Sequence, residues 1–166
     1  MQIRAGTEDD AAAAIGLWTE AYTRRGPEGR KTPYVESEYF DSYRDGRVFV
    51  AEEAGAVLGV VVFLPSGVAT WTGEDEAALT RLAVTTTVRG RGVGRALAER
   101  CGEEAEAAGA SAIVLWSRPY QTPAHRLYES LGYRYVPARD SSDADGGRRV
   151  FVRDLTKPSQ PSSDAR

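Results

Sequence analysis

The sequence predicts a single-domain α/β fold of the mixed α+β kind, in which helices flank one β-sheet. The chain has 166 residues, of which 42% are hydrophobic and 27% charged, as expected for one domain with one core. Helical and strand-like segments follow one another in the order helix, strands, helix, strand, helix, strands. This alternation is too irregular for a barrel. We predict a domain over residues 1–155 and a disordered, Pro- and Ser-rich tail over residues 156–166.

The N-terminal half is expected to contain two helices and a hairpin. Residues 8–24 carry apolar side chains at helical spacing and predict the first helix, and residues 34–43 predict a second, shorter one. Residues 48–51 and 57–64 are β-favouring and predict two strands joined by a tight turn. The second strand is continuously apolar, which is typical of a central strand covered on both faces.

The C-terminal half alternates strands with helices. An apolar stripe over residues 93–108, closed by Gly109, predicts a helix. Thr122 and Pro123 are suited to begin another helix, which Gly132 ends. Strands are expected at residues 79–84, 111–116, 133–136 and 149–155, the last two separated by an acidic loop that contains glycines.

Charge, hydropathy and cysteine content exclude several classes of protein. A formal net charge of −3 argues against a sequence-independent nucleic-acid binder. No apolar run approaches the roughly 20 residues that span a bilayer, and residues 1–7 lack the apolar core of a secretory signal. The one cysteine, Cys101, excludes an internal disulfide framework. We therefore expect a cytoplasmic protein that binds neither nucleic acid nor membrane.

The most informative segment is a glycine- and arginine-rich turn that precedes the helix at residues 93–108. Unpaired backbone N–H groups and the helix dipole favour an anion there. Glycine lacks the Cβ atom that would keep a bulky diphosphate away from those amides, and the arginines add positive charge. A solvated surface turn is the alternative, but it would not need three glycines at alternate positions. The residues are Arg89, Gly90, Arg91, Gly92, Val93, Gly94 and Arg95.

The spacing of this turn argues against two common phosphate sites. No lysine follows, as G-x-x-x-x-G-K-[ST] requires, and Arg95 stands where G-x-G-x-x-G has its third glycine. Three motifs in order instead resemble the GCN5-related N-acetyltransferase (GNAT) superfamily, over roughly residues 1–155. They are Leu82-Ala83-Val84, then Arg89-x-x-Gly92-x-Gly94 with Ala96-Leu97, then Ala124-x-x-Leu127-Tyr128-Glu129-x-Leu131-Gly132-Tyr133.

The resemblance implies a twisted mixed sheet whose central fourth and fifth strands splay apart to hold acetyl-CoA as cosubstrate, without a metal. It places backbone groups of Leu82, Ala83 and Val84 beside the pantetheine and acetyl group, and the pyrophosphate on the amides from Arg89 to Gly94, with Arg95 adjacent. Gln121 stands where many family members have an asparagine near the cofactor. An amine-bearing small molecule or peptide is the implied acceptor, and a homodimer is left open.

Acetyl transfer from a thioester to an amine needs a proton donor for the departing thiolate and a way to deprotonate the amine. Tyr128 is the candidate acid, because a phenol of pKa about 10 is protonated at neutral pH. Core packing of its ring is compatible with that role. Some family members use a glutamate on the fourth strand as base, and Glu76, just upstream of the apolar stretch here, is the candidate, directly or through water. A solvated loop charge is its alternative reading.

The remaining polar residues give weaker indications. His125 is expected to be exposed on its helix, and Cys101 to pack in the core. Glu36, Glu38 and Asp41 favour a cationic amine acceptor. Aromatic residues that the resemblance places near the acceptor are Trp18, Tyr22, Tyr34, Tyr39 and Trp116, the last followed by Ser117. The sequence thus predicts an acetyl-CoA-dependent N-acetyltransferase, with a non-catalytic acyl-CoA-binding regulatory module as the alternative.

Overall fold

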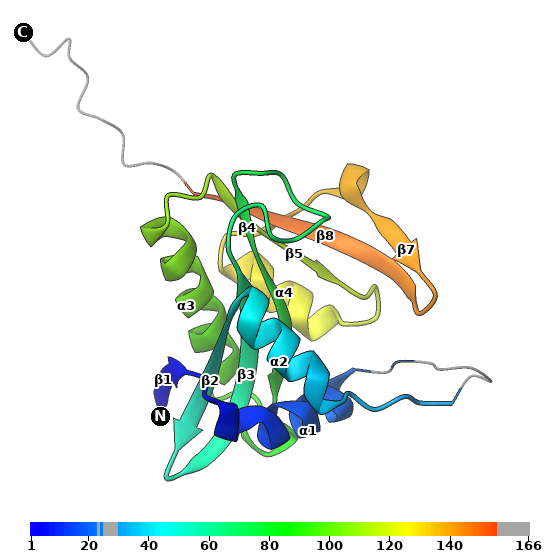
Figure 1. Ribbon diagram of the computed structural model, residues 1–166. Helices are drawn as coiled ribbons and strands as arrows, with labels where there is room; N and C mark the ends of the chain where they lie inside the picture. Colours follow the sequence, from blue (N-terminus) through cyan, green and yellow to red (C-terminus); the bar gives the residue numbers. More distant parts are fainter. Residues whose placement is uncertain (23, 25–29, 156–166) are drawn as a thin grey trace, which may run out of the picture.

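A sheet of eight strands forms the centre of the molecule, and helices cover both of its faces (Figure 1). The structure is a computed structural model that describes residues 1–22, 24 and 30–155. The tail at residues 156–166 lies outside the described residues. The strands are ordered β1-β2-β3-β4-β5-β8-β6, with β7 paired to β8 alone. All neighbours pair antiparallel except β4 and β5, which are parallel. The predicted mixed α/β class is confirmed.

The elements follow the predicted order, with changes of a few residues at their ends. The helices are α1 (Ala11–Ala21), α2 (Glu36–Asp45), α3 (Val93–Ala107) and α4 (Thr122–Ser130). The strands are β1 (Gln2–Ala5), β2 (Arg47–Glu53), β3 (Ala56–Leu64), β4 (Glu76–Val84), β5 (Ala112–Ser117), β6 (Arg134–Tyr135), β7 (Ser141–Asp143) and β8 (Gly146–Asp154). One expectation was wrong. The acidic segment before the last strand is not simply a loop, because Ser141–Asp143 pair with β8 as a hairpin.

The two larger core clusters lie on opposite faces of the sheet. Side chains alternate between faces along a strand, and in β2 Val48 and Val50 pack with α1 and α2, whereas Phe49 and Ala51 pack with α3. The continuous apolar run of β3 supplies both clusters, as its composition predicted. The helices on the two faces therefore hold β3 and β4 firmly in the middle of the molecule.

The parallel strands β4 and β5 separate part-way along their length. They pair only where residues 76–78 face residues 112–114, and the remainder of β4 diverges from β5. Beyond the separation, β4 has a bulge. Val60 faces Ala83 and Val62 faces Thr80, so that two residues of β4 lie opposite one residue of β3. Arg81 within the bulge has φ +54°, a left-handed conformation that non-glycine residues seldom adopt. The predicted splaying of these strands is confirmed.

Two side chains of the α1 segment hold the bulge in place. The indole Nε1 of Trp18 donates to the carbonyl of Arg81 at 2.8 Å, and the hydroxyl of Tyr22 donates to the carbonyl of Leu82. These bonds satisfy carbonyl groups that the opened sheet leaves without a strand partner.

In the described part of the chain, no helix is both long and apolar enough to cross a lipid bilayer.

Candidate active site

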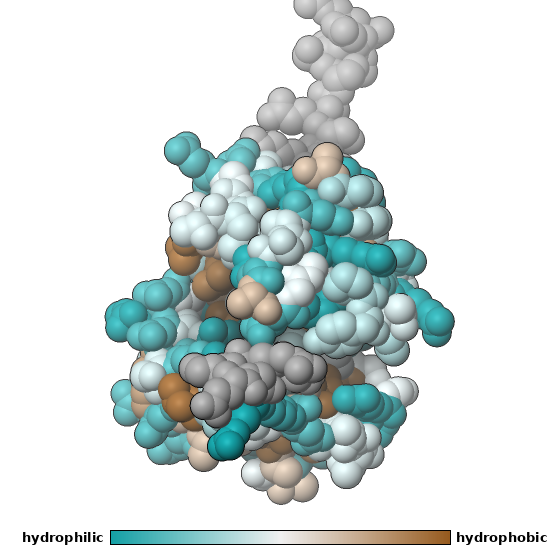
Figure 2. All heavy atoms as spheres, turned by 90° about the vertical axis from the view of Figure 1, so that its right-hand side faces the viewer, coloured by the Kyte–Doolittle hydropathy of each residue, from teal (hydrophilic) through white to brown (hydrophobic). Residues whose placement is uncertain are grey.

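A groove of about 1290 Å³ runs through the opening between β4 and β5. The glycine-rich turn before α3 lines one end of it, and aromatic and arginine side chains line the other. The face that Figure 2 turns towards the reader is mostly hydrophilic, with its largest hydrophobic area in a recess at the left. The groove is large enough for a ligand of drug size or above.

The glycine-rich turn has the backbone geometry of an anion site. Gly90 and Gly92 have φ +82° and +81°, conformations suited to glycine. No side chain caps α3, and its first backbone bond runs from the amide of Ala96 to the carbonyl of Gly92 at 3.0 Å. The amides of Val93, Gly94 and Arg95 are therefore available to a ligand, at the positive end of the helix dipole.

The three arginines of this turn have different surroundings. Arg89 and Arg95 line the groove. Arg95 donates to the hydroxyl of Ser130 at 2.5 Å, and Arg89 has no ion-pair partner among the residues described. Arg91 does not line the groove, because its guanidinium turns to β2 and pairs with Glu53 at 3.0 Å. The structure therefore brings Arg89 and Arg95, but not the Arg91 side chain, to the predicted phosphate site.

The backbone of β4 presents one edge to the groove. The amide of Thr85 donates to Leu58 of β3 at 2.8 Å, and Ala83 faces Val60. Backbone groups alternate in direction along a strand, so the amides of Leu82 and Val84 point away from β3, towards the groove. Of their carbonyls, that of Leu82 already accepts from Tyr22. Leu82, Ala83 and Val84 all line the groove.

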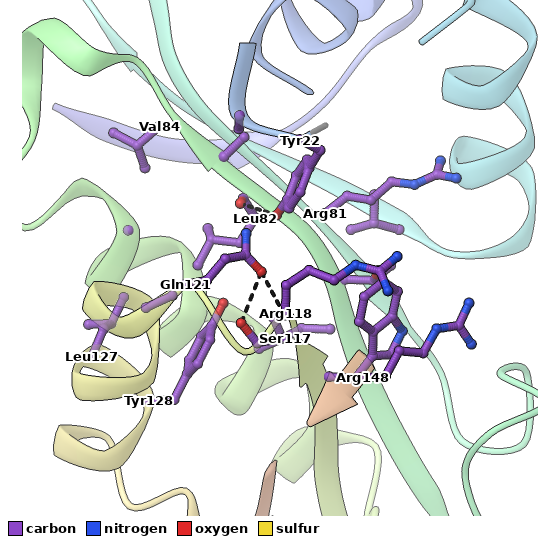
Figure 3. A pocket seen from close by; sticks show the side chains of 18 of the residues that line it. Tyr22, Arg81, Leu82, Val84, Ser117, Arg118, Gln121, Leu127, Tyr128 and Arg148 are labelled. Atoms are coloured by element: carbon purple, nitrogen blue, oxygen red, sulfur yellow. Dashed lines mark hydrogen bonds between the residues drawn. The ribbon is translucent and has the colours of Figure 1, made fainter. Parts of the chain in front are cut away.

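Tyr128 lies beside this edge on α4. Its ring packs against Tyr133 and Phe151, with centroid distances of 5.8 and 6.2 Å, and its hydroxyl points into the pocket, towards Gln121 (Figure 3). Burial raises the pKa of Tyr128, so the phenol is protonated at neutral pH. The hydroxyl forms no hydrogen bond with another described residue and is free to donate to a ligand.

Glu76 lies away from Tyr128 and does not line the groove. Its carboxylate binds the guanidinium of Arg139 through both oxygens, at 2.8 and 3.0 Å, and accepts from the amide of Gly73 at 2.7 Å. The hydrogen bond from Arg139 lowers the pKa of Glu76. This carboxylate is thus neutralised at the closed, paired end of β4, and the structure does not bring it to the predicted reaction centre.

Gln121 is held by a small hydrogen-bond network at the end of β5. Its Oε1 accepts from the hydroxyl of Ser117 at 3.0 Å and from the amide of Arg118 at 2.8 Å (Figure 3). With the oxygen occupied, the NH₂ group is left to donate to a ligand. His125 completes the network, with Nε2 at 3.1 Å from the Ser117 hydroxyl and 3.0 Å from the Arg118 carbonyl.

The expectation that His125 is exposed was wrong. Its side chain lies against the ring of Phe151 at a centroid distance of 5.0 Å, and the residue is only 8% exposed. Burial lowers the pKa of His125, which favours the neutral imidazole. Cys101 is buried in the core as expected, and burial raises the pKa of its thiol. No cluster of His, Cys, Asp and Glu suited to a metal occurs within the described ranges.

The far end of the groove is richer in arginine than the sequence suggested. Tyr22, Tyr34, Trp116 and Ser117 line it, whereas Trp18 and Tyr39 are fully buried in the core. Of the acidic residues considered for a cationic acceptor, Glu38 and Asp41 line the groove, and Glu38 pairs with Arg24 at 2.5 Å. Among the lining residues that sequence reasoning missed are three arginines, Arg81, Arg118 and Arg148. Nothing local marks them, because their neighbours come from distant segments.

Related proteins match parts of the chain in sequence. Rat N-acetylaspartate synthetase is 39% identical over 67 residues, which cover 40% of this chain and 22% of that protein. An IAA acetyltransferase from Azospirillum brasilense is 36% identical over 89 residues, covering 54% of this chain and 55% of the relative. The chain therefore spans between a fifth and just over half of the length of these relatives.

Solved structures match almost the whole fold. A GCN5-related N-acetyltransferase from Kribbella flavida superposes with a TM-score of 0.73 at 25% identity, covering 93% of this chain and 97% of that one. A putative acetyltransferase from Salmonella typhimurium, solved with its cofactor acetyl-CoA, gives a TM-score of 0.74 at 20% identity, covering 98% of both chains. The model of the acetyltransferase (GNAT) family matches residues 12–133. Since that match spans most of the chain, the protein belongs to the acetyltransferase (GNAT) family.

Proposed function

We propose that the protein transfers the acetyl group of acetyl-CoA to a primary amine, on a small molecule or a peptide, by direct attack in a ternary complex. The observation that carries this proposal is that a single groove joins the anion-binding turn, the open edge of β4 and the hydroxyl of Tyr128. The turn would bind a diphosphate, the strand edge an amide-containing pantetheine arm, and the hydroxyl would face a thioester.

Acetyl-CoA fits this groove part by part. Its pyrophosphate would accept from the amides of Val93, Gly94 and Arg95, with Arg89 beside it. Its pantetheine amides would pair with the free edge of β4 at residues 82–84, as an added strand does. The Salmonella neighbour, with the same fold, was solved with its cofactor acetyl-CoA, which supports this placement.

The transfer then needs three events at the thioester. The amine lone pair attacks the carbonyl carbon, and amides of β4 stabilise the developing oxyanion. As the carbon–sulfur bond breaks, the Tyr128 hydroxyl gives its proton to the thiolate, whose conjugate acid has a pKa of about 8.5 in a free thiol. The amine loses its extra proton to solvent in the open groove, since Glu76 is engaged with Arg139.

The engagement of Glu76 also favours a second candidate, a non-catalytic acyl-CoA-binding regulatory module. Both functions require the cofactor groove, but only the enzyme releases thiol. The decisive experiment measures free thiol from acetyl-CoA with a panel of amines that includes amino acids, peptides and polyamines. Thiol release together with acetylated product is expected. Tight CoA binding without turnover on any acceptor would support the module.

A thermal shift assay tests the cofactor separately. A ligand that binds only the folded state stabilises it by RT ln(1 + [L]/Kd), about 2.7 kcal/mol at a hundredfold excess over Kd. We expect acetyl-CoA to raise Tm, and ATP and NAD, which carry the same phosphate chemistry, to leave it unchanged. Equal shifts with ATP would contradict the assignment of acetyl-CoA.

A further inference from the structure

Three arginines from separate elements meet at the end of the groove opposite the glycine-rich turn. Arg81 comes from the bulge of β4, Arg118 follows β5, and Arg148 lies on β8. In Figure 3 their guanidinium groups all extend to the right of the pocket, away from Val84 and Leu127 at its cofactor end. We call Arg81, Arg118 and Arg148 the arginine cluster.

Arg81 is the member with unused hydrogen-bonding capacity. Its guanidinium lies over the rings of Trp18 and Tyr34, at 5.2 and 5.4 Å from their centroids. Its polar contacts are both made by Nη1, to the hydroxyl of Ser42 at 3.0 Å and the carbonyl of Glu38 at 3.4 Å. No described carboxylate forms an ion pair with it. The N–H groups on Nε and Nη2 are therefore available as a fork for a carboxylate.

Arg118 and Arg148 share one carboxylate. Arg118 binds Asp143 at 2.8 and 3.0 Å, and Arg148 binds the same residue at 2.7 Å. Their guanidinium groups lie 4.7 and 4.6 Å from the ring centroid of Trp116. One carboxylate can neutralise only one of the two cations. Asp145 also lines this end. The other acidic residues that line the groove pair elsewhere, Glu38 with Arg24, and Asp41 and Asp45 with Arg44. Arg81 is thus the member of the cluster whose charge is not paired with a described carboxylate.

Charged side chains from both sides of the β4–β5 opening affect the pKa of Tyr34. Burial raises the pKa of Tyr34, and the positive charges of Arg81, Arg24 and Arg118 all oppose that rise. Glu38 acts in the opposite direction on Tyr34 but is itself bound to Arg24. Arg81 and Arg118 line the same groove as Tyr34 and Leu82, and the Arg81 guanidinium lies 5.4 Å from the ring centroid of Tyr34.

We propose that the arginine cluster binds a carboxylate of the acceptor, with Arg81 as its principal ligand, and that the acceptors are free amino acids. This inference rests on the proposed function, because the amine must meet the thioester near Leu82 and Tyr128. An amino acid carries its carboxylate and its amine on the same small skeleton. It can therefore reach Arg81 and the reaction centre together, which a polyamine cannot do.

The test compares amino acids with their carboxamides. The carboxamide lacks the negative charge, although its less basic amine is more often neutral and hence more often available to attack. We expect kcat/KM for the amino acid to exceed that for its amide by at least about tenfold, since a site built for a polar group rejects analogues lacking it. Arg81→Gln should remove this preference by raising KM for the acid. Arg81→Lys, with charge but no fork, should restore part of it.

Arg134→Gln is the matched control. Arg134 lies on β6, binds the exposed carboxylate of Asp154, and does not line the groove. This variant should keep the wild-type preference. Equal kcat/KM for acid and amide in the wild type, unchanged in Arg81→Gln, would overturn the carboxylate site while leaving the transferase intact.

A binding measurement keeps the two proposals separable. With CoA present, the amino acid should raise Tm more than its amide does, and Arg81→Gln should abolish the difference. If thiol is not released with any amine but this binding difference persists, the proposed catalysis fails and the carboxylate site stands. Equal Tm shifts with acid and amide would contradict the carboxylate site whatever the turnover.

Discussion

Nε2 of His125 lies 3.1 Å from the hydroxyl oxygen of Ser117, inside a buried network that ends at Gln121. Nε2 also lies 3.0 Å from the carbonyl of Arg118, which can only accept, so this nitrogen carries the proton. The Ser117 hydroxyl is then left to donate to Oε1 of Gln121. His125 thereby fixes which end of the Gln121 amide faces the groove, and we regard it as a positioning residue.

Replacing His125 should therefore weaken cofactor binding without touching the reacting atoms. His125→Ala removes the donor to Ser117 and Arg118, and leaving such buried groups unpaired costs about 1–3 kcal/mol of stability. We expect KM for acetyl-CoA to rise several-fold while kcat changes little. His125→Gln, whose amide can still donate, should recover most of the affinity. A fall in kcat alone would contradict this positioning role.

The burial of His125 also predicts a loss of stability in mild acid. The pKa of His125 is lowered in the folded protein, so the unfolded chain takes up the proton first as the pH falls below about 6.5. The stability is complete above that pH and decreases below it. Between about pH 7.5 and about pH 5, the Tm of the wild type should fall more than that of His125→Gln. Parallel Tm curves would show that His125 does not titrate in this range.

A charge at the glycine-rich turn should separate folding from cofactor binding. An added Cβ at Gly94 would lie 3.5 Å from Leu127 and 3.6 Å from Val84, an ordinary contact distance. The Cβ atom of Gly94→Asp is thus accommodated, and an acidic side chain in the first turn favours the helix. We expect an unchanged or higher Tm of the free protein, with CoA affinity reduced at least about tenfold because the introduced carboxylate would repel the diphosphate.

Ala12→Asp is the control for that substitution. Ala12 is exposed at the same second position of its helix, α1, and lies outside the groove. The control adds the same charge at the same position of a helix and should leave CoA affinity unchanged. If Gly94→Asp binds CoA as the wild type does, in a titration followed by calorimetry, the diphosphate site is not at this helix.

Among the carboxylates of the C-terminal hairpin, Asp143 should contribute most to the stability of the folded protein. Hydrogen bonds from Arg118 and Arg148 lower its pKa, so its stabilising effect is present above the ordinary pKa of about 4 and is lost as pH falls further. Asp143→Asn should lower the free energy of unfolding by about 1–3 kcal/mol, between the values for exposed and buried ion pairs. Urea unfolding should show no such loss for Asp154→Asn, whose pair with Arg134 is exposed.

The sequence was sufficient where the information is local. The glycines at 90, 92 and 94 lie close together in the chain, and their spacing alone identified the start of α3 as a candidate anion site. The alternation and length of apolar runs likewise predicted the order of the elements. The separation of β4 from β5 could be predicted only from the family resemblance, because no residue pattern in either strand indicates it.

The sequence was insufficient where one residue meets another from a distant segment. Glu76 is held by Arg139, 63 positions along the chain, which removes it from the groove. His125 is covered by Phe151 of the last strand, although its place on α4 suggested exposure. Arg118 likewise depends on Asp143. Such contacts arise from tertiary packing, which propensity and periodicity do not encode.

The central claim, catalysis at the β4–β5 opening, is tested most directly by kcat for thiol release in Tyr128→Phe. The Phe ring keeps the packing against Phe151, and a buried tyrosine on the same cluster, Tyr133, supplies a matched control, since its hydroxyl has no hydrogen-bond partner in the described structure. We expect Tyr128→Phe to lower kcat and kcat/KM together by at least roughly tenfold, and Tyr133→Phe to retain wild-type kcat. Full kcat in Tyr128→Phe would contradict the assignment of Tyr128 as the proton donor.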